Sequence, residues 1–250
     1  MAILNWMYGI LGVVIGSFLN VCIDRLPLRQ SITTPPSHCP SCDMRLKSFD
    51  LIPVVSYLVL RGRCRYCKDK IPFRVFFVEL FTGLAFYLVW QEFGQSWETA
   101  IISLYCSLLI VIAFIDLEHR KVLNVLVYPA ILLGLIMAPI LHFEEYWIYL
   151  AAGLAGFAAL FLIAFIIPGA MGMGDVKLIL FLGLISGFPE VILLLFLAFV
   201  LGGLTAGILL VMKKINRKDS IAFGPFLALA GFIVLLYGDQ IINWWRRMVL

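Results

Sequence analysis

The chain is built from long apolar runs that short polar stretches interrupt. A helix needs about 20 mostly apolar residues to cross the hydrocarbon layer of a membrane, so such runs predict membrane-spanning helices. Eight runs approach this length, and the sixth is the shortest. They cover Leu4 to Ile23, Val75 to Trp90, Thr99 to Ile115, Val122 to Leu141, Trp147 to Ile167, Val176 to Phe188, Val191 to Met212 and Phe223 to Trp244. We therefore expect an all-α polytopic membrane protein with about eight transmembrane helices.

The boundary between the sixth and seventh runs is weak. Only Pro189 and Glu190 separate them, so a seven-span arrangement with one broken helix is the alternative. The first run starts almost at Met1 without a basic n-region or a small-residue cleavage pattern, which predicts a retained anchor. We divide the chain into a first transmembrane helix (1–25), a polar segment (26–74) and a seven-helix membrane core (75–250).

Composition and charge support this interpretation. The chain is 63% hydrophobic and only 14% charged, with a mean hydropathy of +1.03, which excludes a soluble core or a disordered chain. With eight spans and the N-terminus outside, all 19 Lys and Arg except Arg246 and Arg247 fall on one face. The last group on that face is Lys213, Lys214, Arg217 and Lys218. The positive-inside rule makes this face cytoplasmic, and we expect a multi-pass protein of the plasma membrane.

Three pairs of glycines have the small-xxx-small spacing that lets helix backbones approach closely. They are Gly12 and Gly16, Gly183 and Gly187, and Gly203 and Gly207. In a glycine-rich membrane protein, ordinary packing within one chain explains such pairs better than a dimerisation motif. The sequence leaves the oligomeric state open.

Four cysteines in the polar segment form two CxxC pairs, Cys39 with Cys42 and Cys64 with Cys67. Two such pairs in one loop supply the four thiolates of a tetrahedral zinc site. A cytoplasmic loop is kept reduced, which argues against two disulfides. A closed Cys₄ site has no open position for a substrate, so we expect structural Zn²⁺. Cys22 and Cys106 lie in apolar runs, which favours a packing role.

Ionisable residues inside apolar runs are candidates for function, because charges at membrane depth are costly. Asp116 ends the third run, Asp175 opens the sixth, and Glu79 lies one turn inside the second. Either aspartate alone is explained as a helix cap or as the partner of Arg120 or Lys177. Together, on one side of the membrane, they favour a dyad that shares a proton. One aspartate would activate water and the other would protonate the scissile carbonyl.

The residues around Asp175 carry further expectations. Gly172 and Gly174 predict an irregular segment with positive φ angles and close backbone approach before the helix. Lys177 would face away from Asp175, and snorkelling to the interface is its simplest role. Glu79 either pairs with a base of the zinc loop or lines a substrate pocket.

These motifs, taken in order, resemble the bacterial type IV prepilin peptidases, and among them the competence-type Gram-positive members. The resemblance covers nearly the whole chain, with departures at Leu123 and Ala222, where members commonly have proline. The matching segments are Gly16-Ser-Phe-Leu-Asn20-Val-Cys-Ile-Asp-Arg25-Leu-Pro27, the two CxxC pairs, Ile115-Asp116-Leu, Gly172-Met-Gly-Asp175-Val-Lys177-Leu, Phe223-Gly-Pro225-Phe-Leu and Tyr237-Gly-Asp239.

The resemblance implies a GxGD intramembrane aspartic peptidase with Asp116 and Asp175 as catalytic residues. It would cleave the basic leader from type IV prepilins or competence pseudopilins after a glycine, at the cytoplasmic face. It would then methylate the new N-terminus with S-adenosylmethionine. The remaining site candidates are the supporting residues Gly172, Gly174 and Lys177, and the second-site or substrate-contacting residues Asn20, Arg25 and Glu79.

No Rossmann-type glycine loop locates a methyl-donor site. Besides prepilins and the lipid bilayer we expect no nucleic-acid partner. The alternative is an ion- or proton-coupled transporter that uses Asp116, Asp175 and Glu79 as a path. Its weakness is that all three lie at one edge of the membrane, whereas transporter sites lie near the midplane. A zinc-bearing scaffold without catalysis would leave the GxGD segment unexplained.

Overall fold

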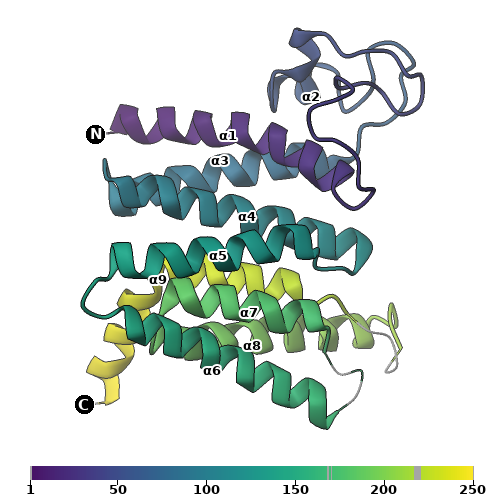
Figure 1. The fold of residues 1–250 in the computed structure, drawn as a ribbon. Coiled ribbons are helices and arrows are strands. Elements are labelled where there is room, and N and C mark those ends of the chain that lie inside the picture. The colour runs from purple at the N-terminus through teal and green to yellow at the C-terminus, as the bar shows by residue number, and fades with distance from the viewer. Residues whose placement is uncertain (1, 168, 170, 217–220, 250) are drawn as a thin grey trace. The chain divides into compact units, whose positions relative to one another are not determined.

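The computed structural model of the protein consists of helices, apart from the connecting segments and a loop-rich segment between α1 and α3 (Figure 1). It describes residues 2–167, 169, 171–216 and 221–249, so Arg217 and Lys218 of the basic group lie outside the described residues. These residues contain two isolated β-bridges and no strand. The helices are α1 (Ala2–Arg25), the 3-10 helix η1 (Ser48–Leu51), α2 (Val55–Val59), α3 (Phe73–Phe93), α4 (Trp97–His119), α5 (Asn124–Leu141), α6 (Tyr146–Ile166), α7 (Met173–Ser186), α8 (Glu190–Val211) and α9 (Gly224–Val249).

Each of the eight apolar runs has become a helix of its own in the described chain. Seven of them are long and apolar enough to cross a membrane, and α7 is the exception. It has 14 residues and is therefore about 21 Å long. Gly187 ends α7 with a φ of 75°, and α8 begins at Glu190. The predicted all-α membrane fold is confirmed, and the alternative of one broken helix for α7 and α8 is wrong.

The chain forms two compact units, Met1–Val111 and Ile112–Leu250. The first contains α1, the cysteine segment, α3 and most of α4. The second contains the end of α4 and helices α5 to α9. Our division into functional segments at residues 26 and 75 stays a prediction, because compactness of the backbone does not test function.

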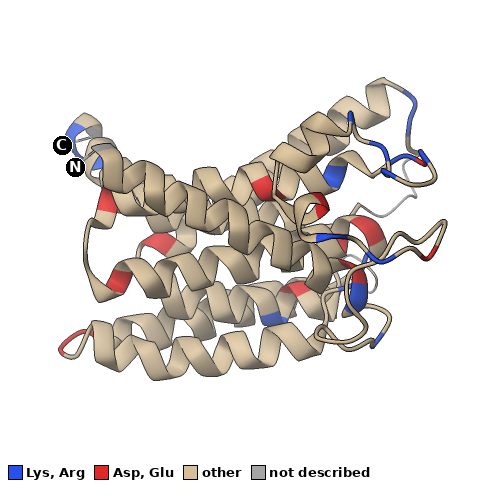
Figure 2. Ribbon diagram, turned by 90° about the horizontal axis from the view of Figure 1, so that it is seen from above, with Lys and Arg blue, Asp and Glu red and all other residues tan. Residues whose placement is uncertain are grey.

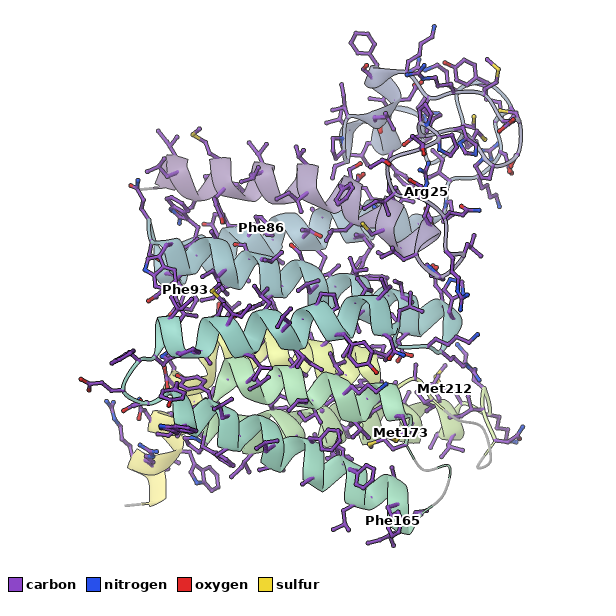
Figure 3. All side chains as sticks on the ribbon, in the orientation of Figure 1. Arg25, Phe86, Phe93, Phe165, Met173 and Met212 are labelled. Carbon is purple, nitrogen blue, oxygen red and sulfur yellow. The ribbon has the colours of Figure 1, made fainter. Side chains whose placement is uncertain are left out.

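In the first unit, α1 lies against α3 through its glycines. A Cβ atom added to Gly12 would lie 2.7 Å from the Cβ of Phe86, and one added to Gly16 would lie 2.8 Å from the Cα of Glu79. Phe86 lies between the two helices (Figure 3). Both glycines are needed for this close approach, so the first of the three pairs serves ordinary helix packing, as predicted.

In the second unit, α7 is the central helix and contacts α5, α6, α8 and α9. Its closest neighbour is α6, where an added Cβ on Gly183 would lie 2.6 Å from the Cα of Gly153. Gly183 is therefore a packing residue, whereas Gly203 and Gly207 on α8 have nothing within 4 Å. Because neighbouring helices surround α7, this helix need not be long enough to face lipid along a full span.

Charge is distributed as a membrane protein requires. Figure 2 shows that Lys and Arg gather on connecting segments and helix ends, and that the helices are largely free of charge between their ends. Large apolar side chains such as Phe165 and Val211 are 74% and 84% exposed on α6 and α8. Such a surface is stable only in contact with lipid or another apolar partner.

Candidate functional site

Asp116 lies in the last turn of α4, where Arg120 ends the helix with a φ of 52°. Its carboxylate is buried and accepts a hydrogen bond of 3.0 Å at Oδ2 from the backbone N–H of Gly224, the first residue of α9. The N-terminus of a helix carries partial positive charge, which favours the carboxylate. A Cβ on Gly224 would lie 2.7 Å from Oδ2, so a larger residue here would displace the carboxylate.

Asp175 lies in the first turn of α7, and its carboxylate accepts a hydrogen bond from the backbone N–H of Gly172, the N-cap residue. The other oxygen, Oδ1, is buried and has no hydrogen-bond partner among the described residues. The charges of Asp116 and Asp175 are close enough to interact. The second unit therefore brings together the two predicted aspartates. The Asp116 carboxylate lies at the N-terminus of α9, and the Asp175 carboxylate lies at the N-terminus of α7.

The expected glycine turn before Asp175 is wrong in one respect. Gly172 has a φ of −76°, and Gly174 is already part of α7 without a positive φ. The positive φ of this region belongs to Gly169. Close approach, the other half of the expectation, is correct, since a Cβ on Gly174 would lie 2.6 Å from the Cβ of Val122. The glycines therefore serve packing rather than a special backbone conformation.

Lys177 has two polar partners on α5, and its expected extension to the membrane interface stays a prediction. Its Nζ donates to Asn124 Oδ1 and to the Tyr128 hydroxyl, both at 3.0 Å, and lies 4.9 Å from the centroid of the Tyr128 ring. These contacts hold the start of α7 against the start of α5. Within the described chain neither aspartate forms an ion pair, so the alternative of pairing with Arg120 or Lys177 is not observed. The contacts with helix N-termini are compatible both with the capping alternative and with the favoured dyad.

The four cysteines of the two CxxC pairs form a metal-binding cluster. Their sulfur atoms all lie within 4.8 Å of one another, and those of Cys39 and Cys67 are 3.8 Å apart. In a tetrahedral site with Zn–S bonds of about 2.3 Å, neighbouring sulfurs are about 3.8 Å apart. All six cysteines of the chain are described and none forms a disulfide. The cluster can hold a metal and is consistent with zinc, as the spacing predicted.

Each CxxC pair forms a tight backbone knuckle of the same design. The N–H of Cys39 donates to Met44 O at 3.0 Å, and the N–H of Cys64 donates to Asp69 O at 2.8 Å. A residue with positive φ follows each pair, Asp43 in the first and Lys68 in the second. A β-bridge closes both knuckles, joining His38 to Arg45 and Arg63 to Lys70. The hydrogen bonds and dihedral angles of the backbone therefore orient the thiols without a contribution from a metal.

Polar contacts support the cluster. The backbone N–H groups of Cys67 and Tyr66 lower the pKa of Cys64 to about 7, which favours the thiolate that metals bind. The Ser41 hydroxyl of the first knuckle donates to Asp69 of the second and lowers the pKa of that carboxyl. A further ion pair of 2.6 Å joins Arg65 to Asp50. The two knuckles are therefore joined by side chains as well as by their sulfurs.

The remaining candidates belong to the first unit and have different surroundings. Arg25 donates to the backbone oxygens of Ser31 and Pro35 at 2.9 and 2.7 Å and holds the loop that follows α1. Asn20 and Glu79 are buried in the α1–α3 interface. Glu79 accepts hydrogen bonds from a backbone N–H and a hydroxyl, so the expected partner, a base of the zinc loop, is not the one observed.

One site residue escaped the sequence-based prediction. Gly224 belongs to one of the segments that match the family, but no role was expected for it, because its contact with Asp116 joins positions that lie far apart in the chain. The segment Phe223-Gly-Pro225 was the available signal, because a glycine directly before a proline at a helix start suggests close backbone approach.

In comparisons with known proteins, each unit matches a model of the A24 type, which comprises type IV leader peptidases. Residues 10–93 match the bacterial Peptidase A24 N-terminal domain, and residues 103–207 match the Type IV leader peptidase family. The first match contains the four cysteines, and the second contains both aspartates.

Relatives match over almost the full length. A protein of Stutzerimonas stutzeri is 34% identical, covering 93% of this chain and 90% of its own. A protein of Bacillus subtilis is 30% identical, covering 96% and 97%. Both are named prepilin leader peptidase/N-methyltransferase. No solved structure matches the chain significantly, and these relatives do not support the transporter alternative. The chain belongs to the type IV leader peptidase family.

Proposed function

We propose that the protein is an intramembrane aspartic endopeptidase that removes the leader of type IV prepilins or competence pseudopilins after a glycine. It is also an N-methyltransferase that modifies the new N-terminus. The observation that carries the peptidase proposal is the pair Asp116 and Asp175, two buried carboxylates held near each other at the N-termini of α9 and α7.

The environments of the two carboxylates suggest different roles. Asp116 accepts the Gly224 N–H, which stabilises the ionised form needed to take a proton from water. Asp175 keeps a buried oxygen without a partner in the described chain, which is costly for a carboxylate but suits a carboxyl group that donates a proton. Water activated by Asp116 would attack the scissile carbonyl while Asp175 protonates its oxygen. When the tetrahedral intermediate collapses, Asp116 gives the proton taken from water to the leaving pilin amine, and a hydroxyl of the intermediate returns a proton to Asp175 as the leader carboxyl group forms.

The cysteine cluster has a structural role in this proposal. Zn²⁺ bound to Cys39, Cys42, Cys64 and Cys67 would have no open coordination position. It would instead stabilise a segment that has few buried apolar residues. The methyl donor is S-adenosylmethionine, by family resemblance, and it supplies an electrophilic methyl group.

Orientation completes the proposal. The basic loops face the cytoplasm of a cell membrane, the N-terminus lies outside, and the zinc segment and both aspartates lie at the cytoplasmic face. The support is the excess of Lys and Arg in the loops on one side of the predicted spans. The basic leader of a prepilin would be presented on the same side.

The test is cleavage of a purified prepilin by the full-length protein in lipid vesicles, followed by mass spectrometry. Asp116→Asn and Asp175→Asn should each lose leader cleavage, because both proton-transfer groups are required. Glu118→Gln is the matched control, since Glu118 is an exposed carboxylate two residues beyond Asp116 on α4. Retained cleavage in either folded aspartate variant, or equal loss in the control, would contradict the dyad.

A further inference from the structure

A second polar site lies in the first unit, in the interface between α1 and α3. Asn20 is 5% exposed and Glu79 is 4% exposed. Asn20 Nδ2 donates to Val75 O at 3.0 Å and to Gly16 O at 3.3 Å, and its Oδ1 is buried without a partner among the described residues. The peptidase chemistry of Asp116 and Asp175 uses neither residue, so this buried pair has no explanation in the proposed cleavage.

Among the described residues, Glu79 accepts hydrogen bonds only from neutral donors. Its Oε2 accepts the backbone N–H of Val54 at 2.7 Å, and the Ser17 hydroxyl also donates to the carboxylate. None of the ion pairs of the described chain includes Glu79. A buried carboxylate without a cationic partner is costly, which makes this site a strong attractor for positive charge.

Asn20 and Glu79 are linked through neighbouring residues of α1 and α3. Val75, which Asn20 contacts, is one turn before Glu79 on α3, and Ser17, which contacts Glu79, is three residues before Asn20 on α1. A primary ammonium group has three N–H donors, so it can bond to a carboxylate and to an amide oxygen at the same time.

The backbone above Glu79 is strained. Val54 has a φ of 63° and a ψ of −51°, and the N–H of Val55 bonds to Pro53 O at 2.6 Å. This is a γ-turn of the rare positive-φ kind, and a β-branched residue is unfavourable at its centre. The hydrogen bond from Val54 to Glu79 holds the turn in place. A ligand that bonds to Glu79 Oε2 in place of the Val54 N–H would allow Val54 to adopt an unstrained conformation. The turn is therefore suited to open and close access to Glu79.

We infer that Glu79 and Asn20 Oδ1 form a binding site for a primary ammonium group used in methyl transfer. Two reactants of that step carry one, the new N-terminus of the mature pilin and the amino-acid part of the methyl donor. In the first case Glu79 takes the proton of the bound ammonium, and the amine lone pair forms an N–C bond as the S–C bond of the sulfonium donor breaks. This inference rests on the proposed methyltransferase function.

Glu79→Gln separates charge from shape, because the glutamine oxygen still accepts the Val54 N–H. The assay uses a pre-cleaved pilin peptide and S-adenosylmethionine, with leader cleavage and zinc content measured on the same protein. We expect unchanged cleavage and zinc content, and a rise of about 10- to 100-fold in the KM of one reactant. If that reactant is the pilin amine, the kcat of methylation should fall as well, because glutamine cannot take the ammonium proton. A rise for the peptide identifies the pilin amine, and a rise for the donor identifies the donor amine.

The control is Thr82→Val, a buried change of similar shape on α3. The Thr82 hydroxyl bonds only within its own helix, to Val78 O at 2.7 Å, so both KM values should stay unchanged. Unchanged KM values in Glu79→Gln, or an equal loss of cleavage, methylation and zinc, would overturn the site. A native protein that cleaves but yields no methylated product would overturn the methyltransferase function and the site with it.

Discussion

The cysteine cluster and the aspartate pair are built in opposite ways. Each cysteine knuckle is closed by hydrogen bonds between residues that are near neighbours in the chain, and the same bonds recur in both knuckles. The aspartates instead come from α4 and α7 and depend on the start of α9. A local site tolerates changes elsewhere in the fold, whereas a site assembled from distant helices is sensitive to how they pack. The following predictions examine this difference, from the largest expected effect to the smallest.

The largest effect should come from the aspartates themselves. Asp116→Asn and Asp175→Asn should each lower the cleavage rate by about 10²- to 10⁴-fold, the usual contribution of a proton-transfer group. Because the pair acts as one unit, the double variant should be no slower than the slower single variant. Single-turnover cleavage of a prepilin measures all three rates. Multiplicative losses would show that the two carboxylates act independently.

Metal removal should affect the cysteine segment and leave the helices intact. Chelation, or Cys39→Ser combined with Cys64→Ser, should make residues 26–74 sensitive to protease, because metal binding supplies much of the folding free energy of such segments. Limited proteolysis and metal analysis measure the change, and circular dichroism should show unchanged helix content. A protease-resistant segment without metal would contradict the structural role.

Gly224→Ala tests whether helix packing controls the aspartate site. The new Cβ would lie 2.7 Å from Asp116 Oδ2 and displace the carboxylate, and displacements of about 1 Å cost up to about 10²-fold in rate. Gly203→Ala on α8 is the matched control, since nothing lies within 4 Å of its added Cβ. We expect slower cleavage only for Gly224→Ala. Equal rates for the two variants would show that Asp116 does not need its present position.

Lys177→Met should have the smallest effect. It removes the hydrogen bonds to Asn124 and Tyr128 that hold α7 against α5 but leaves Asp175 in place. Exposed contacts of this kind are worth about 1 kcal/mol or less, so cleavage should fall by a few-fold, with a matching fall in thermal stability. A loss as large as that of Asp175→Asn would mean that Lys177 takes part in the chemistry.

The periodicity of apolar residues and the spacing of the cysteines were sufficient to predict the local features of this protein. The apolar runs predicted the helices, and the CxxC spacing predicted the metal cluster, because both depend on residues that are near in sequence. Leu123, where members of the family commonly have proline, has a φ of −76°, which is close to the value a proline would impose.

Contacts between distant residues were not predictable from these patterns. Neither periodicity nor spacing indicates that Gly224 bonds to Asp116, that Lys177 bonds to residues of α5, or that Val54 bonds to Glu79. Each contact depends on how two helices, or a helix and a loop, are placed relative to each other. The wrong expectation of positive φ at Gly172 and Gly174 has the same origin, because their role is set by the approach of Val122 to Gly174.

The shortness of α7 has a consequence for the thickness of the membrane around the site. Its length of about 21 Å is about 9 Å less than a hydrocarbon layer of about 30 Å, whereas α6, α8 and α9 have 21 or more residues. Because longer helices surround α7, the depth that it leaves uncovered need not face lipid and can hold a water-accessible depression between them. Under the proposed function, hydrolysis then takes place below the level of the lipid headgroups. A pilin helix would be cut there without first being drawn out of the bilayer.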